Sequence, residues 1–415
     1  MNKMRHLATT ILMIPAFILL AGCAQRYQNL DEYMGAGDFN FRYFGGSGSL
    51  ITEAPLGYYF IANEFIFYAD KDTMAPVVLC GRPHCLHDNE ANEALKALCN
   101  AFFPSGPTSY IEYYEGNLYI FAHHLNTITL DLRTSLFRVS LDGSRRDIVF
   151  DTTTPHTPGS IAIHRGVVYY AESAYTIDGV LRYGIMAFDL NSRGASPEMI
   201  YIGEEDRGSV GGIFAYGNNL FFLETGFNRA FLSRVDIVNR TGGRPFAKPY
   251  GADWNQNLHT IHNGKILFAN WQVLFTTTPG NVEQLHLYTA NLDGQEPVRQ
   301  MHLEMRGGYI GGGRHMSDGE HLWFSDNALG GDKPMAARGT WVVDPYTGGV
   351  IATVLRPDDM PPFEDFNSST FLPGGERHAF FIIGGTFTGS PIEIWYADKS
   401  LMETDSMEWR LLIKK

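Results

Sequence analysis

One short segment of this 415-residue chain carries three cysteines and a histidine at the spacing C-x4-C-x-H-x11-C, namely Cys80, Cys85, His87 and Cys99. Thiolate sulfur and imidazole nitrogen are ligands that Zn²⁺ prefers, and four of them fill its tetrahedral shell. We therefore expect these residues to hold one structural zinc ion. His84 is an alternative to His87 as the fourth ligand.

The same cysteines also permit a disulfide. A single bridge, either Cys80–Cys99 or Cys85–Cys99, would leave one spare thiol because the number of cysteines is odd. An oxidising compartment would allow such a bridge. The C-x-x-C spacing of redox-active proteins does not occur here, so a catalytic cysteine is the least favoured interpretation.

The elements around these residues would bring the ligands together. Cys80 ends a predicted strand, and the next glycine and Pro83 predict a turn before Cys85. Residues 90–98 (EANEALKAL) predict a short helix that returns Cys99 to the other ligands. The segment resembles one in lipoproteins of gut Gram-positive bacteria, of form L-C-x-x-P-x-C-x-H…C-N-A, a likeness that implies no established activity. The matching residues are Leu79, Cys80, Pro83, Cys85, His87, Cys99, Asn100 and Ala101.

Seven segments of the chain share one pattern: a glycine turn, a strand rich in aromatics, a variable loop and a strand that ends in aspartate. Each copy predicts a four-stranded sheet, which cannot bury both faces alone and must stack on its neighbours. Radial stacking predicts an all-β propeller of seven blades over residues 44–415, or six if the degenerate first copy is not a blade. The cysteine segment, residues 80–101, is then an insertion after the first blade. The copies are 56–70, 114–143, 164–192, 216–240, 262–294, 317–348 and 373–400.

The repeats also resemble known proteins. Asn117–Tyr119, Leu136–Gly143 (LFRVSLDG) and Leu285–Gly294 (LHLYTANLDG) are similar to the strands of bacterial lipoprotein propellers of the TolB-like and receptor type. This resemblance covers residues 44 to 413 and implies the fold rather than a function. Asp142 and Asp293, each followed by glycine, predict hairpin turns, which we favour over a calcium-binding role.

The N-terminus predicts export. Lys3 and Arg5 precede an apolar core from Leu7 to Leu20, which is shorter than the ~20 residues that span a membrane. The core ends in Leu-Ala-Gly-Cys, and the whole segment resembles a bacterial lipoprotein signal. The resemblance implies cleavage after residue 22, acylation (palmitate or a similar chain) of Cys23 and a tether over residues 23–43. A plain secretory signal or membrane anchor is the alternative.

This signal predicts an extracytoplasmic location. The mature protein would be held by lipid on the outer surface of the cytoplasmic membrane, or at the outer membrane if the organism has one. With 44% hydrophobic and 19% charged residues, the chain is not of the disordered class. Its formal net charge of -13 disfavours binding to phosphate backbones, so we expect no nucleic-acid partner.

Motifs for catalysis are missing from the sequence. It contains no G-x-S-x-G, H-E-x-x-H or EF-hand pattern. We therefore expect a binding or interaction module rather than an enzyme, one that presents a propeller loop face to a glycan, peptide or envelope partner. Trp254 and Trp271 fall in predicted loops and are candidate ligand-binding aromatics. A glycan-active hydrolase or lyase and a structural envelope-assembly scaffold are the alternatives.

Overall fold

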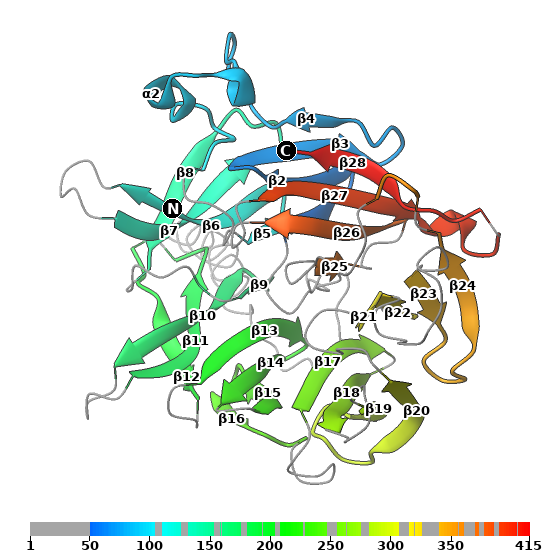
Figure 1. Ribbon diagram of the computed structural model, residues 1–415. Coiled ribbons are helices and arrows are strands. Elements are labelled where there is room, and N and C mark those ends of the chain that lie inside the picture. Colours follow the sequence, from blue (N-terminus) through cyan, green and yellow to red (C-terminus); the bar gives the residue numbers. More distant parts are fainter. Residues whose placement is uncertain are drawn as a thin grey trace, which may run out of the picture.

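The chain folds into seven antiparallel sheets of four strands each, arranged around a centre as the blades of a β-propeller (Figure 1). The computed structural model describes no helix that is long and apolar enough to cross a membrane. Cys23 and the predicted tether lie outside the described residues. The described residues are 50–415 apart from 104–109, 126–131, 153–157, 159, 176–180, 193, 204–207, 227–228, 247–254, 263, 275–281, 307–314, 319, 326–339, 356, 361–369, 373–376, 386–389 and 405.

Each of the seven sheets consists of four consecutive strands. The first blade contains β1 (Ile51–Ala54), β2 (Gly57–Ala62), β3 (Phe65–Asp70) and β4 (Pro76–Val78). The second contains β5 (Ile111–Tyr114), β6 (Asn117–Leu125), β7 (Leu132–Ser140) and β8 (Arg146–Asp151). The third contains β9 (Ile161–His164), β10 (Val167–Tyr175), β11 (Leu181–Asp189) and β12 (Glu198–Ile202).

The remaining blades follow the same order. The fourth contains β13 (Ser209–Tyr216), β14 (Asn219–Gly226), β15 (Arg229–Asp236) and β16 (Thr241–Gly243). The fifth contains β17 (Asn255–His262), β18 (Lys265–Leu274), β19 (Val282–Asn291) and β20 (Val298–Arg306). The sixth contains β21 (His315–Ser317), β22 (Leu322–Ser325), β23 (Thr340–Val343) and β24 (Val350–Val354), and the seventh β25 (Thr370–Leu372), β26 (His378–Gly385), β27 (Ser390–Asp398) and β28 (Arg410–Lys414).

The inner strands explain why the copies must stack. All six residues of β2 are buried, although successive side chains of a strand point to opposite faces. Both faces of this sheet are therefore covered by neighbouring blades. The seven-bladed prediction is confirmed, and the degenerate first copy is a complete blade.

An aspartate closes the third strand of every blade. Its carboxylate accepts a hydrogen bond from the backbone N–H two residues later, which fixes the turn into the outermost strand. This confirms the predicted turn role of Asp142 and Asp293. The seven aspartates are Asp70, Asp142, Asp189, Asp236, Asp293, Asp344 and Asp398.

The insertion leaves the first blade after β4 and returns to the same blade. It carries a 3-10 turn, η1 (His87–Asn89), and a one-turn helix, α2 (Glu93–Lys96). The Ile66 carbonyl accepts from the Leu79 N–H (2.9 Å), and the Ile66 N–H donates to the Ala101 carbonyl (2.9 Å). Both ends of the insertion therefore pair with one residue of β3, and the loop projects from the rim of the ring (Figure 1).

Candidate metal centre

The insertion brings four potential ligands to one point. The sulfur atoms of Cys80, Cys85 and Cys99 and a ring nitrogen of His87 all lie within 4.8 Å of one another. The Cys99 Sγ and His87 Nδ1 atoms are 3.7 Å apart. A tetrahedral Zn²⁺ with ordinary Zn–S and Zn–N bonds separates such atoms by about 3.6 Å. The group could therefore hold a metal ion with little rearrangement.

Of the two candidate histidines, the structure selects His87. His84 lies outside the ligand group and lines a neighbouring cavity of about 200 Å³, which also contacts Cys85 and Cys99. All three cysteines are free thiols in the structure. The predicted ligand set is thus assembled, and the predicted disulfide does not form here.

A turn and a capped helix position the ligands. The φ angle of His87 is +53°, in the left-handed region that histidine enters more readily than branched residues. The Asn92 side chain accepts from the N–H groups of Ala94 (3.0 Å) and Leu95 (3.4 Å) and so caps α2. The Cys99 N–H then donates to the Lys96 carbonyl (2.9 Å), which holds the last ligand on the end of the helix. The helix predicted over 90–98 is real but shorter, because this cap starts it at Glu93.

The thiols differ in their readiness to ionise. Burial raises the pKa of the Cys99 thiol to about 12, and the Ala101 N–H offsets only part of this effect. Burial also opposes ionisation of Cys80, but hydrogen bonds from the Arg82 and Asn100 N–H groups and from the neighbouring thiols lower its pKa. Backbone N–H groups aimed at sulfur stabilise thiolate, and a bound cation would favour ionisation further.

The second blade supports the insertion through the turn at Gly143. The Gly143 carbonyl accepts from the Gly81 N–H (3.1 Å) and from the Asn100 side-chain amide (2.9 Å). Gly143 has φ +66°, and a Cβ there would lie 2.5 Å from the Leu79 carbonyl oxygen. Only glycine allows the two backbones to approach this closely.

Arg146, in the outermost strand of the second blade, holds the far end of the insertion. Its guanidinium donates to the carbonyls of Ala97 (3.3 Å), Cys99 (3.1 Å) and Phe102 (2.5 Å). It also lies 5.2 Å from the centre of the Phe103 ring. These carbonyls follow α2 in the chain, and a guanidinium placed among them donates charge-assisted hydrogen bonds to all three. Sequence reasoning missed this arginine, since no local pattern shows which residue of another blade faces the insertion.

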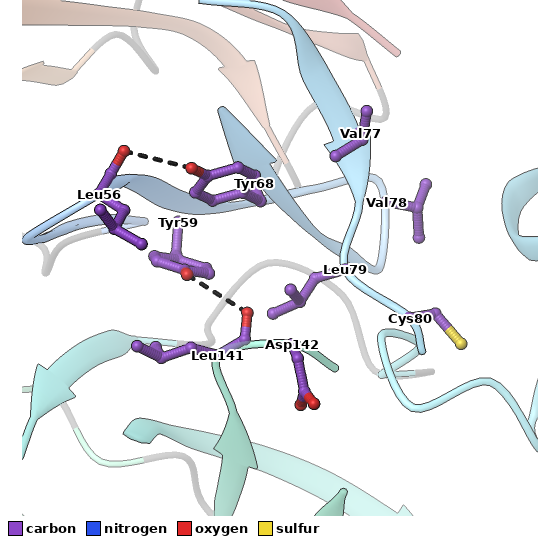
Figure 2. A pocket seen from close by; sticks show the side chains of 9 residues that line it. All are labelled: Leu56, Tyr59, Tyr68, Val77, Val78, Leu79, Cys80, Leu141 and Asp142. Carbon is purple, nitrogen blue, oxygen red and sulfur yellow. Dashed lines mark hydrogen bonds between the residues drawn. The ribbon is translucent and has the colours of Figure 1, made fainter. Parts of the chain in front are cut away.

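A groove of about 440 Å³ borders the insertion between the first two blades (Figure 2). The Tyr59 and Tyr68 rings lie 5.1 Å apart in its wall. Their hydroxyls donate to the carbonyls of Leu141 (3.3 Å) and Leu56 (3.2 Å). Leu56 is 75% exposed and Val77 55% exposed. The remaining lining residues are Val78, Leu79, Cys80 and Asp142.

The ligand-binding roles of Trp254 and Trp271 stay predictions. Trp254 lies outside the described residues. Trp271 lies within β18, paired with Asn255 and Leu285, so the prediction that it falls in a loop is wrong. The β18–β19 ladder continues as far as Leu274, which extends the hairpin beyond the expected loop boundary. The Trp271 side chain is outside the described part of the chain.

Two buried carboxylates serve the packing between blades. Glu224 of the fourth blade accepts from the Tyr201 hydroxyl of the third (2.5 Å) and pairs with Arg244 of its own blade (2.7 Å). Asp318 accepts from Lys399 (2.9 Å) and from the Trp323 indole (2.9 Å). Burial opposes ionisation of Asp318, but His321 and Lys399 nevertheless hold its pKa below its ordinary value. A carboxylate neutralised in this way is poorly suited to general acid or base catalysis.

Comparisons with known proteins find distant likenesses. No protein-family profile matches the sequence, and no curated protein matches it. The chain is similar to the β-propeller domain of the Trilobed protease from Pyrococcus furiosus, which has an open velcro topology, with 9% identity over 71% of this chain and 82% of that chain and a TM-score of 0.42. It is also similar to TolB from Acinetobacter baumannii (14% identity, 86% and 81% covered, TM-score 0.36) and to a putative TolB from Agrobacterium tumefaciens (9%, 65% and 85%, 0.38). The seven four-stranded sheets of this chain themselves show the propeller fold.

Proposed function

We propose that the protein is a lipid-anchored, extracytoplasmic binding module that captures an apolar peptide segment in the groove between its first two blades. The observation that carries this proposal is the groove itself, an open apolar hollow beside a compact insertion. In its wall the half-buried Tyr68 ring lies against the buried Tyr59 ring, and both hydroxyls are already hydrogen-bonded. Such a surface suits apolar side chains better than a sugar, which needs unengaged polar partners.

Peptide capture can be tested by display selection. A random peptide library selected on the purified ring should enrich apolar sequences, and synthetic copies should bind in titration calorimetry. Leu56→Glu places a charge in the groove and should weaken binding at least tenfold. Leu411→Glu changes an equally aliphatic, 43% exposed residue of the last blade and should leave binding unchanged. No enrichment, or equal losses in both variants, would count against the proposal.

We further propose that the insertion holds one zinc ion in a structural role. Four protein ligands leave no position open for substrate, which distinguishes a structural site from a catalytic one. Purified protein should contain one zinc per chain by elemental analysis. His87→Asn should lose it, whereas His84→Asn should keep it, since asparagine tolerates the positive φ of both residues. A metal-free wild type with one disulfide and one thiol would refute the site.

The location proposal rests on the N-terminal sequence. Cys23 should carry the lipid, so the protein should label with a palmitate analogue and partition with membranes. Cys23→Ser should abolish labelling. Labelling that persists in this variant would place the lipid elsewhere.

A further inference from the structure

In the described residues, the ring closes between its first and last blades without exchange of a strand. Every described sheet uses four consecutive strands, so β1–β4 meet β25–β28 through side chains. Figure 1 shows the N-terminal blue blade beside the C-terminal red one. One buried apolar cluster spans this seam, and its members from the last blade are Leu372, Phe380, Ile382, Ile392, Ile394, Leu412 and Ile413.

A histidine lies inside the seam. His378, the first residue of β26, is 2% exposed, and its Nδ1 shares a hydrogen bond of 3.0 Å with the Tyr58 hydroxyl of the first blade. The His378 ring lies 5.5 Å from both the Tyr58 and Tyr396 rings, and Tyr58 in turn packs edge-on against Phe380 at 4.8 Å. This aromatic setting gives an imidazolium little of the solvation that it has in water.

The charges that face His378 come from both blades. Asp398 and Arg377 belong to the last blade, and Glu53 and Lys71 to the first. Glu53 and Lys71 pair with one another. Among the described residues, no carboxylate lies within ion-pair distance of His378, so a proton on this ring would lack a dedicated counter-ion.

We propose that acidification loosens the seam between the first and last blades through protonation of His378. A buried, uncompensated imidazolium destabilises the closed seam, whereas an opened seam exposes the ring to water. The side-chain closure makes this possible, because no backbone ladder between described strands crosses the seam.

The direction of the pH effect follows from the buried ring. Burial lowers the pKa of His378 to about 4, below its ordinary value. The closed seam therefore keeps its full stability above about pH 6.5 and loses it as the pH falls from there toward about 4. At pH 5 the opening equilibrium should rise about 30-fold over that at pH 7.5.

Local hydrogen exchange tests this on the full chain. The protection of peptides from β2 and β26 is measured at pH 7.5 and pH 5.0, each relative to a β14 peptide at the same pH, which cancels the intrinsic pH dependence. The wild type should lose protection selectively at the seam. His378→Gln keeps a hydrogen-bonding side chain that does not titrate. In this variant the protection of the β2 and β26 peptides relative to the β14 peptide should be the same at both pH values.

A buried histidine of another seam provides the matched control. His164 is 0% exposed and lies 2.7 Å through Nε2 from the Gly217 carbonyl, between the third and fourth blades. His164→Gln should respond to acid at the first–last seam as the wild type does. Uniform loosening in the wild type, or an unchanged acid response in His378→Gln, would overturn the proposal. If His378→Gln does not fold, the wild-type measurement is the test. A wild type whose β2 and β26 peptides lose no more protection at pH 5.0 than its β14 peptide refutes the proposal.

Discussion

The first blade meets its two neighbours in different ways. Toward the second blade, the contact outside the core is mostly polar: the Gly143 carbonyl accepts from the Gly81 N–H and the Asn100 amide, and the Arg146 guanidinium donates to carbonyls of the insertion. Toward the last blade it is an apolar packing that encloses the Tyr58–His378 hydrogen bond, with the Asp72–Arg377 ion pair at the surface. The first contact depends on main-chain geometry and the ligand cluster, the second on the charge of one ring.

The two interfaces should be sensitive to different kinds of change. Contacts to main-chain groups depend on the path of the chain, so the rim should respond to metal loading, to any added Cβ and to loss of the arginine that binds these groups. Side-chain packing tolerates small backbone shifts but not a buried charge. Perturbations of one interface should therefore leave the other nearly unaffected.

Metal removal should have the largest effect on the rim. If zinc is held at about 1,000 times its dissociation constant, chelation should lower the free energy of unfolding by about 4 kcal/mol. Chemical denaturation with and without a chelator measures this. His87→Asn should match the chelated protein, and chelator should change it no further. Equal stability of loaded and chelated protein would contradict the structural role.

A methyl group added at Gly143 should have the second largest effect on the free energy of unfolding. Gly143→Ala combines positive φ with a backbone overlap at Leu79 and should cost about 3 kcal/mol. Gly116→Ala has φ +80° with nothing within 4 Å of its Cβ, so it should cost only about 1 kcal/mol. The difference between the two unfolding free energies isolates the close approach. Equal losses would mean that the insertion does not press on this turn.

Loss of the Arg146 guanidinium should have an intermediate effect on the free energy of unfolding. Arg146→Met keeps an unbranched stem but removes the charged donor from three carbonyls, of which only that of Cys99 keeps a backbone N–H among the described residues, and should cost about 2 kcal/mol. The neighbouring Arg145 pairs with Asp147 at the surface, so Arg145→Met should change stability by less than about 0.5 kcal/mol. Thermal unfolding compares the pair. If Arg146 and the metal ion hold the same loop, Arg146→Met should lower the unfolding temperature less in chelated protein than in metal-loaded protein.

Tyr58→Phe should have the smallest effect. It removes one neutral hydrogen bond and should cost about 1 kcal/mol at neutral pH. Its effect should add to that of chelation within experimental error, because the two sites share no partners. A coupling energy above about 0.5 kcal/mol in this double cycle would show that the two interfaces of the first blade communicate.

Much of the fold follows from the repeats. The glycine turns, the alternation and the terminal aspartates are local signals, and each aspartate indeed caps its own turn. The ligand set was also predictable, because the cysteines and His87 are close in sequence and only a short turn and helix connect them. The choice between His84 and His87 needed the backbone path, as both have positive φ.

The supports of the site could not be predicted. Arg146 is 47 residues away from Cys99, and its contact depends on how two blades pack. The Asp142-Gly143 dipeptide predicts a hairpin turn, but it does not indicate that the backbone at Leu79 packs closely against this turn. The same holds for His378, which lies 320 residues from Tyr58. Sequence patterns of local period carry no information about which blade faces come together.

The insertion is also a portable unit. Its two ends leave and rejoin the sheet at hydrogen-bonding groups of a single residue, Ile66, so the register of the first blade does not depend on what lies between them. A short hairpin could replace residues 80–100 and yield a ring free of cysteine at this position. Conversely, another small domain with closely spaced termini could be grafted there. The rim of the first blade is thus a natural attachment point at which new recognition loops can be exchanged while the propeller stays constant.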